Sequence, residues 1–598
     1  MTIPMGADRL PLGMVTLAWL AVSALLLIVN FSAIATIKFP DPDDLLRLLQ
    51  VRDWLAGQGW YDVTQYRMNP PQGGPMHWSR LVDLPLALVI FLFTPLVGSG
   101  NAELVALVLV PLLTLFVVMW LGARLTARIS GREAAMLACF MMVMIVPVTH
   151  QLRPMRIDHH GWQIALALVA LGALIDGNHK RGGLVLGLAL AGWLSISMEG
   201  LPLAAAFMGY CAILWLIDPE ERHRLANAMV VLAGASAALF AATRLGSSDA
   251  LVQYCDALAP VHIVIFGFGA LALTGLAWWN PQHRLLLITG FAVTGGTALA
   301  ILATQAPQCA TGAFAELDPL VREFWYERVY EGLPLWRQTG VAISQTLALP
   351  LLAMVAAWLH YRQHGDSFIT WLHSVQGRLT VMTLAALAVA ILVERASAVA
   401  SLYAMPLAAG LVMNWLRKVR TTQNPLRRVA ATLGLFLMVT PGLVIAPASA
   451  LVSERAARIE RVTKIIAEAA KCELPGNIAA LNALPRSNFM TPLDIGPALL
   501  YATDHNIVAS GHHRNDAAMR DIVRFFSSAP DEAHSIAQER NIDYVAFCEG
   551  LAEPRLYAMR HPEGLMATLS DDEVPAWLEP VPFAGAKGLR VWRVQPQR

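Results

Sequence analysis

The chain has 598 residues, of which 56% are hydrophobic and only 15% charged, and its mean hydropathy is +0.51. This composition excludes an ordinary soluble protein, because long apolar runs with few charges recur up to about residue 447. The net charge of +1 hides a clustering of basic residues in short loops, which indicates topology and is no evidence for nucleic acid. We therefore expect a membrane domain over residues 1–449 and a soluble domain over residues 450–598.

The apolar runs predict a polytopic α-helical membrane protein. The run at 14–37 lacks a small-residue cleavage site and is expected to be a retained first span. The run at 81–97 contains an aspartate and two prolines. If it lies along the membrane surface, the remaining runs, about thirteen, alternate so that the basic loops all face the cytoplasm. The outer face then receives residues 38–100, 149–159 and 305–339, the turn that begins at Arg395, and the soluble domain.

A polar stretch, RPMRIDHHGW at residues 153–162, lies between two apolar runs. Ionisable side chains at the mouth of membrane spans are costly unless they bind something. Asp158 and His160 are two positions apart and can turn toward one divalent cation, while Arg156 can bind a phosphate. His159 is a further candidate ligand, although a single histidine at such a place is more often an interfacial residue.

The first outer loop begins FPDPDDLLRLLQVRDWL, which predicts a short amphipathic helix capped by Asp41. Asp43 and Asp44 follow in its first turn. Three acids at one helix end are explained either as an acidic cap or by a bound cation. Because Asp41 and Asp158 both follow a span at the outer surface, we predict that they bind the same metal ion. Asp43 is then an additional ligand, and Asp44 is a weaker candidate.

Two further outer segments carry ionisable residues that we assign to the site. The loop at residues 305–339 is too charged to span and contains Glu331 within VYEGLP. Arg395 opens a turn between two spans, where it either snorkels or clamps a phosphate at the membrane surface. Glu394 beside it is expected to neutralise it. Glu199, within SMEGLP, is ambiguous and stays outside the predicted site.

The six cysteines fall into three pairs. Cys139 and Cys211 lie in apolar runs and are expected to be core thiols. The other four lie in loops and in the soluble domain, which we place in an oxidising compartment. The candidate disulfides are therefore Cys255 with Cys309 and Cys472 with Cys548.

The soluble domain is predicted to be a small α/β domain that follows a charged helix at residues 453–471. Short apolar segments, NIAAL, NIVASG and DYVAFC, indicate strands, while MRDIVRFF, DEAHSIAQER and the residues after Leu551 indicate helices. The sequence contains neither GxGxxG after a strand nor GxxxxGK[ST], so it offers no nucleotide cradle.

Taken in order, these motifs resemble the catalytic subunits of oligosaccharyltransferases, the GT-C membrane glycosyltransferases that include archaeal and bacterial single-subunit forms. Asp41, Pro42 and Arg47 resemble the aspartate-proline and arginine signature of the first loop of that family. The Asp-His-His of residues 158–160 matches literally the second acidic motif of archaeal members. The resemblance implies a GT-C fold, with Asp41 as a metal and catalytic carboxylate and Arg47 near the substrate.

The resemblance continues in the later segments. Glu331 lies in the order of a family glutamate that contacts the acceptor, and Arg395 resembles the arginine that binds the donor pyrophosphate. In the soluble domain LDIG, with Asp494 and Gly496, resembles the Trp-Trp-Asp-Tyr-Gly stretch that reads the hydroxy amino acid of the glycosylation sequon. The two tryptophans are replaced by proline and leucine here. This departure leaves the class of acceptor open.

These expectations combine into one predicted activity. The chain would be a metal-dependent glycosyltransferase that uses Mn²⁺ or Mg²⁺ and a polyprenyl-phosphate or polyprenyl-pyrophosphate sugar donor. Asp41, Asp158 and His160 would hold the ion, and Arg395 with Arg156 would bind the donor phosphate. Asp41 and Glu331 would position the acceptor.

We place this enzyme in a bacterial or archaeal-type cytoplasmic membrane, with its C-terminal domain on the extracytoplasmic, periplasmic side. The acceptor is a protein, a lipid or a surface polysaccharide. A transporter or flippase of lipid-linked sugars is the alternative from another class. The gathering of ionisable residues on the outer face, rather than along a path through the bilayer, favours the enzyme.

Overall fold

The computed structural model describes residues 12–312, 314–365, 367–450, 474–548, 550–582 and 588–596. The chain forms two compact units. Unit 1 comprises Met1–Lys38, Trp78–Ala313 and Tyr330–Ala448, and unit 2 comprises Phe39–His77, Phe314–Val329 and Ser449–Arg598. Two segments of the outer loops therefore share a unit with the C-terminal part of the chain.

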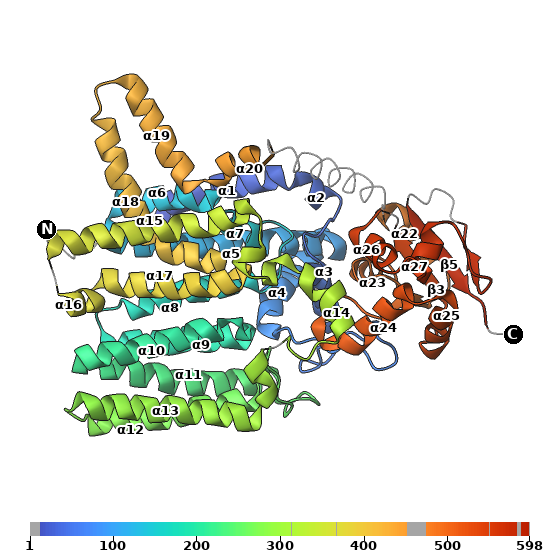
Figure 1. The fold of residues 1–598 in the computed structure, drawn as a ribbon, viewed down its shortest axis with the longest axis horizontal. Helices are drawn as coiled ribbons and strands as arrows, with labels where there is room; N and C mark the ends of the chain where they lie inside the picture. The colour runs from blue at the N-terminus through green and yellow to red at the C-terminus, as the bar shows by residue number, and fades with distance from the viewer. Residues whose placement is uncertain are drawn as a thin grey trace. The chain divides into compact units, whose positions relative to one another are not determined.

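Unit 1 is helical, and its long helices run side by side (Figure 1). Each begins where an apolar run begins, because a membrane span satisfies its backbone hydrogen bonds only within a helix. The helices of unit 1 are, in chain order, α1 (Leu12–Val29), α2 (Phe31–Ala35), α4 (Arg80–Val97), α5 (Ser99–Ser130), α6 (Arg132–Met144), α7 (Val146–Gln151), α8 (His160–Leu174), α9 (His179–Ile196), α10 (Leu201–Ile217), α11 (Arg222–Thr243), α12 (Pro260–Trp279), α13 (Arg284–Gln305), α15 (Gly340–His364), α16 (Phe368–His373), α17 (Val375–Leu392), α18 (Ser397–Arg420), α19 (Pro425–Val439) and, at its end, α20 (Gly442–Ala450).

Among the described residues, ten helices are long and apolar enough to cross a membrane, or up to eleven if the bent pair α19 and α20 is one span. The apolar helices α6, α8 and α9 pack in the same core but are too short or too polar for these criteria. The expected thirteen spans therefore exceed the number that length and composition support. The α4 helix, expected along the membrane surface, is one of the ten, and its orientation to the membrane stays a prediction.

The α18 helix lies at the centre of unit 1. It contacts α5, α6, α8, α15 and α17. Of the 18-residue stretch that could cross a membrane, 83% of the residues are buried. Its buried face is rich in alanine, including Ala400, Ala404 and Ala408, and small residues let neighbouring membrane helices approach closely. The position of Arg395, just before α18, is therefore fixed by the best packed helix of the unit.

Unit 2 contains a five-stranded sheet in the order β2-β1-β3-β5-β4. β1 pairs in parallel with β2 and β3, whereas β5 runs antiparallel to β3 and β4. The strands are β1 (Asn488–Met490), β2 (Asn506–Ile507), β3 (Tyr544–Cys548), β4 (Leu578–Pro580) and β5 (Leu589–Val594), and the helices are α3 (Pro42–Leu55), α14 (Pro319–Phe324), α22 (Leu474–Asn482), α23 (Gly496–Ala502), α24 (Asp516–Ser527), α25 (Pro530–Glu539), α26 (Ala552–Arg560) and α27 (Leu565–Ser570).

The first outer loop extends this sheet. Met68 forms a parallel bridge with Ile507, and Asn69 donates its N–H to the Ile507 carbonyl at 2.9 Å. The Arg67 guanidinium binds the carbonyls of Thr503 at 2.6 Å and Leu500 at 2.7 Å, at the end of α23. The loop thus covers the β2 edge, which would otherwise expose unpaired backbone groups.

The structure corrects one predicted strand and confirms several other elements. NIAAL lies in α22, because a short apolar run suits a buried helix as well as a strand. The strand predicted at NIVASG is confined to Asn506–Ile507, whereas DYVAFC matches β3. The three helices predicted later are α24, α25 and the pair α26 and α27. The charged helix predicted at residues 453–471 lies outside the described residues.

The cysteine predictions are confirmed where they fall on described residues. Cys255 and Cys309 form a disulfide, and Cys139 and Cys211 are buried thiols. Cys548 is disulfide-bonded, and its predicted partner, Cys472, lies outside the described residues.

Candidate active site

The stretch at residues 153–162 turns sharply before it enters α8. Met155 is buried and adopts a left-handed backbone with φ of 72°, which is rare for a residue other than glycine. Its N–H donates to the Leu107 carbonyl of α5 at 2.9 Å, so the contact between the two segments holds the turn. The turn places Asp158 just ahead of α8, which begins at His160.

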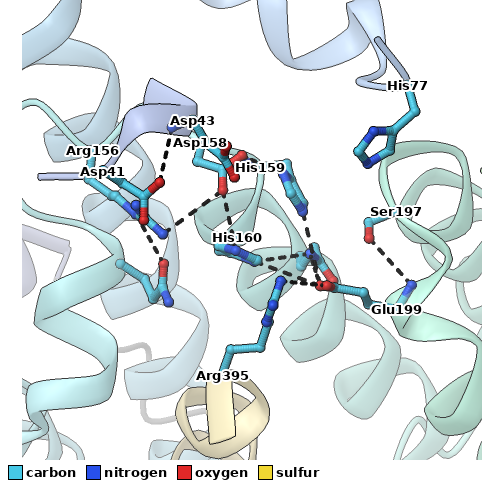
Figure 2. Close-up of polar contacts among 12 residues, drawn as sticks. Asp41, Asp43, His77, Arg156, Asp158, His159, His160, Ser197, Glu199 and Arg395 are labelled. Carbon is cyan, nitrogen blue, oxygen red and sulfur yellow. Dashed lines mark hydrogen bonds and ion pairs between the residues drawn. The ribbon is translucent and has the colours of Figure 1, made fainter. Parts of the chain in front are cut away.

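Asp158, His159 and His160 are all buried, and both histidines contact the Asp158 carboxylate (Figure 2). The backbone N–H of His159 donates to Asp158 Oδ1 at 2.6 Å, and its Nδ1 contacts the same oxygen. Nε2 of His160 lies 3.2 Å from the other oxygen, Oδ2. His159 therefore orients the Asp158 carboxylate toward His160.

A second layer fixes the proton on His160. Trp193 donates its indole N–H to Gln163 Oε1 at 2.9 Å, so the amide nitrogen of Gln163 faces Nδ1 of His160 at 3.3 Å. Nδ1 then accepts a hydrogen bond, and the proton of neutral His160 resides on Nε2, where it meets Asp158. A cation bound at Nε2 would take the place of that proton.

Arg156 joins this group to a residue far along the chain. Its Nη2 lies 3.9 Å from Asp158 Oδ2 and 3.5 Å from Oε2 of Glu331. Glu331 belongs to the short 3₁₀ helix η5 (Tyr330–Gly332) and also lies 3.9 Å from Nε2 of His160. The loop glutamate predicted from sequence and the Asp-His-His stretch therefore meet in unit 1.

Arg395 completes the group. It lies in η7 (Glu394–Ala396), and its Nη1 is 2.7 Å from Oε1 of Glu199 and 3.9 Å from Oε1 of Glu331. Glu199 lies in η1 (Met198–Gly200), and its other oxygen accepts from Gln163 at 3.2 Å. Two glutamates from separate turns thus flank the Arg395 guanidinium, as Figure 2 shows for Glu199.

Sequence reasoning missed two of these residues. Glu199, which we left outside the site, binds the Arg395 guanidinium at 2.7 Å. Gln163 follows His160 by three positions, which is the spacing that brings two helical side chains together and could have indicated it. The Glu394 carboxylate accepts from Ser397 at 3.3 Å, and the charge of Arg395 also lowers its pKa, although burial raises that pKa overall.

Both loop carboxylates are charged at neutral pH. Burial raises the pKa of Asp158, but the imidazoles of His159 and His160 outweigh it and hold that pKa well below its ordinary value. Burial likewise raises the pKa of Glu331, but the charges of Arg395, His160 and Arg156 together outweigh it, so the net direction is downward. Both carboxylates can therefore bind a cation and accept hydrogen bonds.

The residues present fit a divalent ion. Asp158, His159 and His160 each offer a ligand atom, and these atoms lie within 4.8 Å of one another. The 3.2 Å between Asp158 Oδ2 and His160 Nε2 is close to the roughly 3.0–3.4 Å expected for two ligands about 2.1 Å from one ion. A set that mixes imidazole with carboxylate suits Mn²⁺ or Zn²⁺ better than Mg²⁺, which prefers oxygen ligands.

The predicted acids of the first loop belong to unit 2. Asp41 caps α3 by accepting the N–H of Asp43 at 3.0 Å (Figure 2), as its position ahead of a proline predicts. Asp44 and Arg47 lie within α3 and are fully buried, whereas Asp41 and Asp43 are partly exposed. It stays a prediction that Asp41 and Asp158 bind one ion, with Asp43 and Asp44 as further ligands. A substrate role for Arg47 also stays a prediction.

The LDIG segment of unit 2 is shaped by a buried glutamate. Both carboxylate oxygens of Glu553 accept backbone N–H groups, from Leu493 and from Asp494, each at 2.8 Å. The Asp494 side chain is exposed, while Leu493 is buried. The close packing explains why residue 496 is a glycine, because a Cβ at Gly496 would lie 2.9 Å from the Ala509 carbonyl oxygen. Substrate contacts of Asp494 and Gly496 stay predictions.

The fold is that of a polytopic α-helical membrane protein with a small α/β domain in the C-terminal part of the chain. This chain is similar to archaeal oligosaccharyltransferase AglB from Archaeoglobus fulgidus in complex with an inhibitory peptide and a dolichol-phosphate. The identity is 13% and the TM-score 0.68, over 95% of this chain and 72% of that chain.

Two further structures of the Archaeoglobus fulgidus oligosaccharyltransferase are similar. One is tethered to an acceptor peptide with the NVT sequon (14% identity, TM-score 0.62, 98% of this chain and 74% of that chain). The other is a complex with Zn and sulfate (12% identity, TM-score 0.60, 97% of this chain and 73% of that chain). No protein-family model and no curated protein sequence matches this chain. The structures confirm the fold implied by the resemblance seen in the sequence.

Proposed function

We propose that this chain is a membrane glycosyltransferase that transfers a sugar or oligosaccharide from a polyprenyl-phosphate or polyprenyl-pyrophosphate donor at the outer face of a cytoplasmic membrane. One observation carries the proposal. A buried Asp158–His160 pair with the spacing of metal ligands lies beside two arginines, Arg156 and Arg395, which Glu331 links. Ion ligands next to guanidiniums are the chemistry that a phosphate leaving group requires.

The reaction breaks the bond between the anomeric carbon of the sugar and a phosphate oxygen. The acceptor atom forms the new bond to that carbon and loses a proton, while negative charge develops on the phosphate. Asp158 and His160 would hold Mn²⁺ or a similar ion, which neutralises this charge when bound. His159 keeps the Asp158 carboxylate in place, as a partner behind a metal ligand does.

Arg395 is the residue best placed to hold the departing phosphate. Glu199 accepts from its Nη1 at 2.7 Å, and this contact orients the guanidinium. Arg156 is the second donor, oriented by Glu331. Asp41 and Glu331 are assigned to the acceptor, whose proton one of these carboxylates would receive.

The likeness in fold supports a lipid-borne donor, because the AglB structure contains a dolichol-phosphate. Support for a metal comes from a related structure that contains Zn and sulfate, ligands of the kind expected at such a centre. We place the catalytic end of the helices and the C-terminal domain on the extracytoplasmic side, as the basic loops predict.

A lipid or a surface polysaccharide is the second candidate acceptor, and the LDIG segment favours it over a protein sequon. Leu493 stands where the resemblance expects a tryptophan, and its side chain is 3% exposed. It therefore offers little surface to an acceptor peptide. Asp494, which is exposed, remains available to hydroxyl groups of a glycan.

The test uses the purified full chain, Mn²⁺, a membrane extract as the acceptor source, and a panel of radiolabelled dolichyl- and undecaprenyl-linked sugars. The readout is cleavage of the sugar–phosphate bond, which a flippase does not perform. We expect cleavage by the wild type and its loss in Asp158→Ala and Asp41→Ala, while Asp531→Ala, an exposed aspartate of α25, keeps it. Metal-independent cleavage that is unchanged in both site variants would falsify the proposed centre.

A further inference from the structure

A second polar site of unit 1 lies at the other end of α8. A cavity of about 420 Å³ opens between the last turns of α5, the end of α8 and the beginning of α9. This volume is within the range of about 300–1,000 Å³ that small-molecule sites occupy. One side of the cavity is apolar and is formed by Leu121, Leu125, Leu168, Val169 and Val185.

The other side of the cavity is basic. It carries Arg124 and Arg128, which are four residues apart on one face of α5, together with Arg181 and Asp176. Arg181 binds Asp176 with two hydrogen bonds, of 2.8 and 2.9 Å, and so neutralises the single acid of the lining.

Arg124 and Arg128 have no such partner. Over the part of the chain that the structure describes, neither guanidinium makes a hydrogen bond or an ion pair; Arg124 lies over the Trp120 ring, with its Cζ 5.4 Å from the ring centroid. Two positive charges thus face the cavity, and the one acid of its lining, Asp176, is bound by Arg181 and also interacts with the charge of Arg128.

The cavity is at the end of α8 opposite to the candidate active site, and the span expected for α8 would place it near a membrane surface. The 15 residues of α8 rise about 21 Å from His160 to Leu174, a large part of the roughly 30 Å of a hydrocarbon core. The pattern of basic loops predicts that this end faces the cytoplasm.

We propose that this cavity binds the headgroup of an anionic phospholipid of that leaflet. The phosphate would accept hydrogen bonds from Arg124 and Arg128, and the first part of an acyl chain would lie along the apolar wall. A free phosphate would leave this wall uncovered, and the ammonium of a zwitterionic headgroup would lie against two guanidiniums. Charge and apolar lining together therefore select a lipid with net negative charge.

Arginines at helix ends also snorkel without binding any particular lipid, and the chain contains a matched example. Arg362 lies near the end of α15 with its Cζ 5.4 Å from the Trp358 ring centroid, the same stacking as Arg124 on Trp120. It does not line the cavity. Arg362→Gln therefore removes an equivalent charge and serves as the control.

The experiment uses the full chain, delipidated in an uncharged detergent, and native mass spectrometry with added dioleoyl phosphatidylglycerol. We expect one saturable lipid, bound at least tenfold more tightly than dioleoyl phosphatidylcholine. Changing Arg124→Gln and Arg128→Gln together should weaken it about 30-fold, or about 2 kcal/mol, since each basic residue near an anionic surface contributes about 1 kcal/mol. Arg362→Gln should bind like the wild type.

Gly172→Leu provides a second variant, in case the double change disturbs folding. A Cβ at Gly172 would make ordinary contact, at 3.6 Å from Leu125, so a side chain fits there and fills the cavity. It should also weaken lipid binding, while circular dichroism and elution position stay as in the wild type.

Three results would overturn the proposal. The first is equal binding of the two phospholipids. The second is a loss in Arg362→Gln as large as in the cavity variants. The third is displacement of the lipid by millimolar inorganic phosphate or, at equal concentration, by a polyprenyl phosphate, which would assign the cavity to a free anion or to another class of lipid.

Discussion

The two ends of α8 both hold arginines against acidic side chains, but the two clusters are built differently. Beyond Leu174, Glu221 is fully buried and accepts from Arg224 Nε at 2.7 Å and from Arg378 Nη2 at 2.6 Å. The same arginines donate to the last carbonyls of α8, at Ala173 (2.6 Å) and Leu174 (2.9 Å). This cluster caps the helix, where positive charge is favourable.

At the other end of α8 the Arg395–Glu199 contact is equally short, at 2.7 Å, but the contacts of Arg156 are longer and are shared between two carboxylates. Arg156 lies 3.9 Å from Asp158 and 3.5 Å from Glu331. The side chains of Glu331 and Glu199 are 25% and 38% exposed, whereas Glu221 is 0% exposed. A closed cluster with short bonds stabilises a fold, while a looser cluster with exposed carboxylates retains the capacity to bind a ligand.

The largest expected effect is at the loose end. Asp158→Asn keeps the size of the side chain but removes the charge that holds an ion. We expect the rate of donor cleavage per folded molecule to fall at least 1,000-fold, or about 4 kcal/mol. Initial rates and thermal unfolding of the same preparations test this. Activity within tenfold of the wild type would show that the loose cluster is structural as well.

The reverse is expected at the closed end. Glu221→Gln leaves Arg224 and Arg378 buried without their counter-charge, which should destabilise the protein by about 3 kcal/mol. Thermal unfolding in detergent should show a lower melting temperature, while donor cleavage per folded molecule stays unchanged. Glu220→Gln is the control, because that neighbouring side chain is 61% exposed. Similar melting of the two variants would break the comparison.

Arg395→Lys tests whether the geometry of the guanidinium matters at the loose end. Lysine keeps the charge but cannot bind Glu199 and a phosphate through one planar fork. We expect kcat/KM for the donor to fall about 10- to 100-fold, or about 1.4 to 2.8 kcal/mol. Arg417→Lys, at an exposed arginine that binds Glu133, should have no effect. Equal activity of both variants would mean that charge alone suffices.

The smallest effect concerns the buried carboxylate of Glu553. It accepts three hydrogen bonds from neutral donors, namely the N–H groups of Leu493 and Asp494 and, at 2.6 Å, the Tyr557 hydroxyl. Burial, and then the charge of Asp494, raise its pKa to about 8. A raised pKa means that the folded state binds the proton more tightly than the unfolded state. Its stabilising contribution is therefore complete below the ordinary pKa of 4.5 and is lost as the pH rises toward 8.

We expect the wild type to lose stability between pH 5 and pH 8 through this group, because over this range the folded state gives up a proton that it binds more tightly than the unfolded state does. Glu553→Gln cannot titrate, so its melting temperature should vary less over the same range. Parallel profiles of the two proteins would remove Glu553 as the cause.

Several features were predictable because their causes are local. Asp41 caps α3 through a bond to a residue two positions away, and the Asp-His-His stretch carries its own hydrogen bonds. Glu331 and Arg395 were predicted as isolated ionisable residues at span ends, and both lie in the cluster. The strand error at NIAAL has a local cause too, since five apolar residues do not distinguish the two periodicities.

The amino-acid sequence by itself determined the membrane class, the helices that apolar runs require, and the residue types of the candidate centre, because hydropathy, capping and ligand chemistry depend on side chains near one another in the chain. Only the tertiary structure decided which charges meet. Glu199, which lies almost two hundred positions away, binds Arg395, and two segments of the outer loops join unit 2. These pairings depend on how helices pack, and packing unites residues that lie hundreds of positions apart.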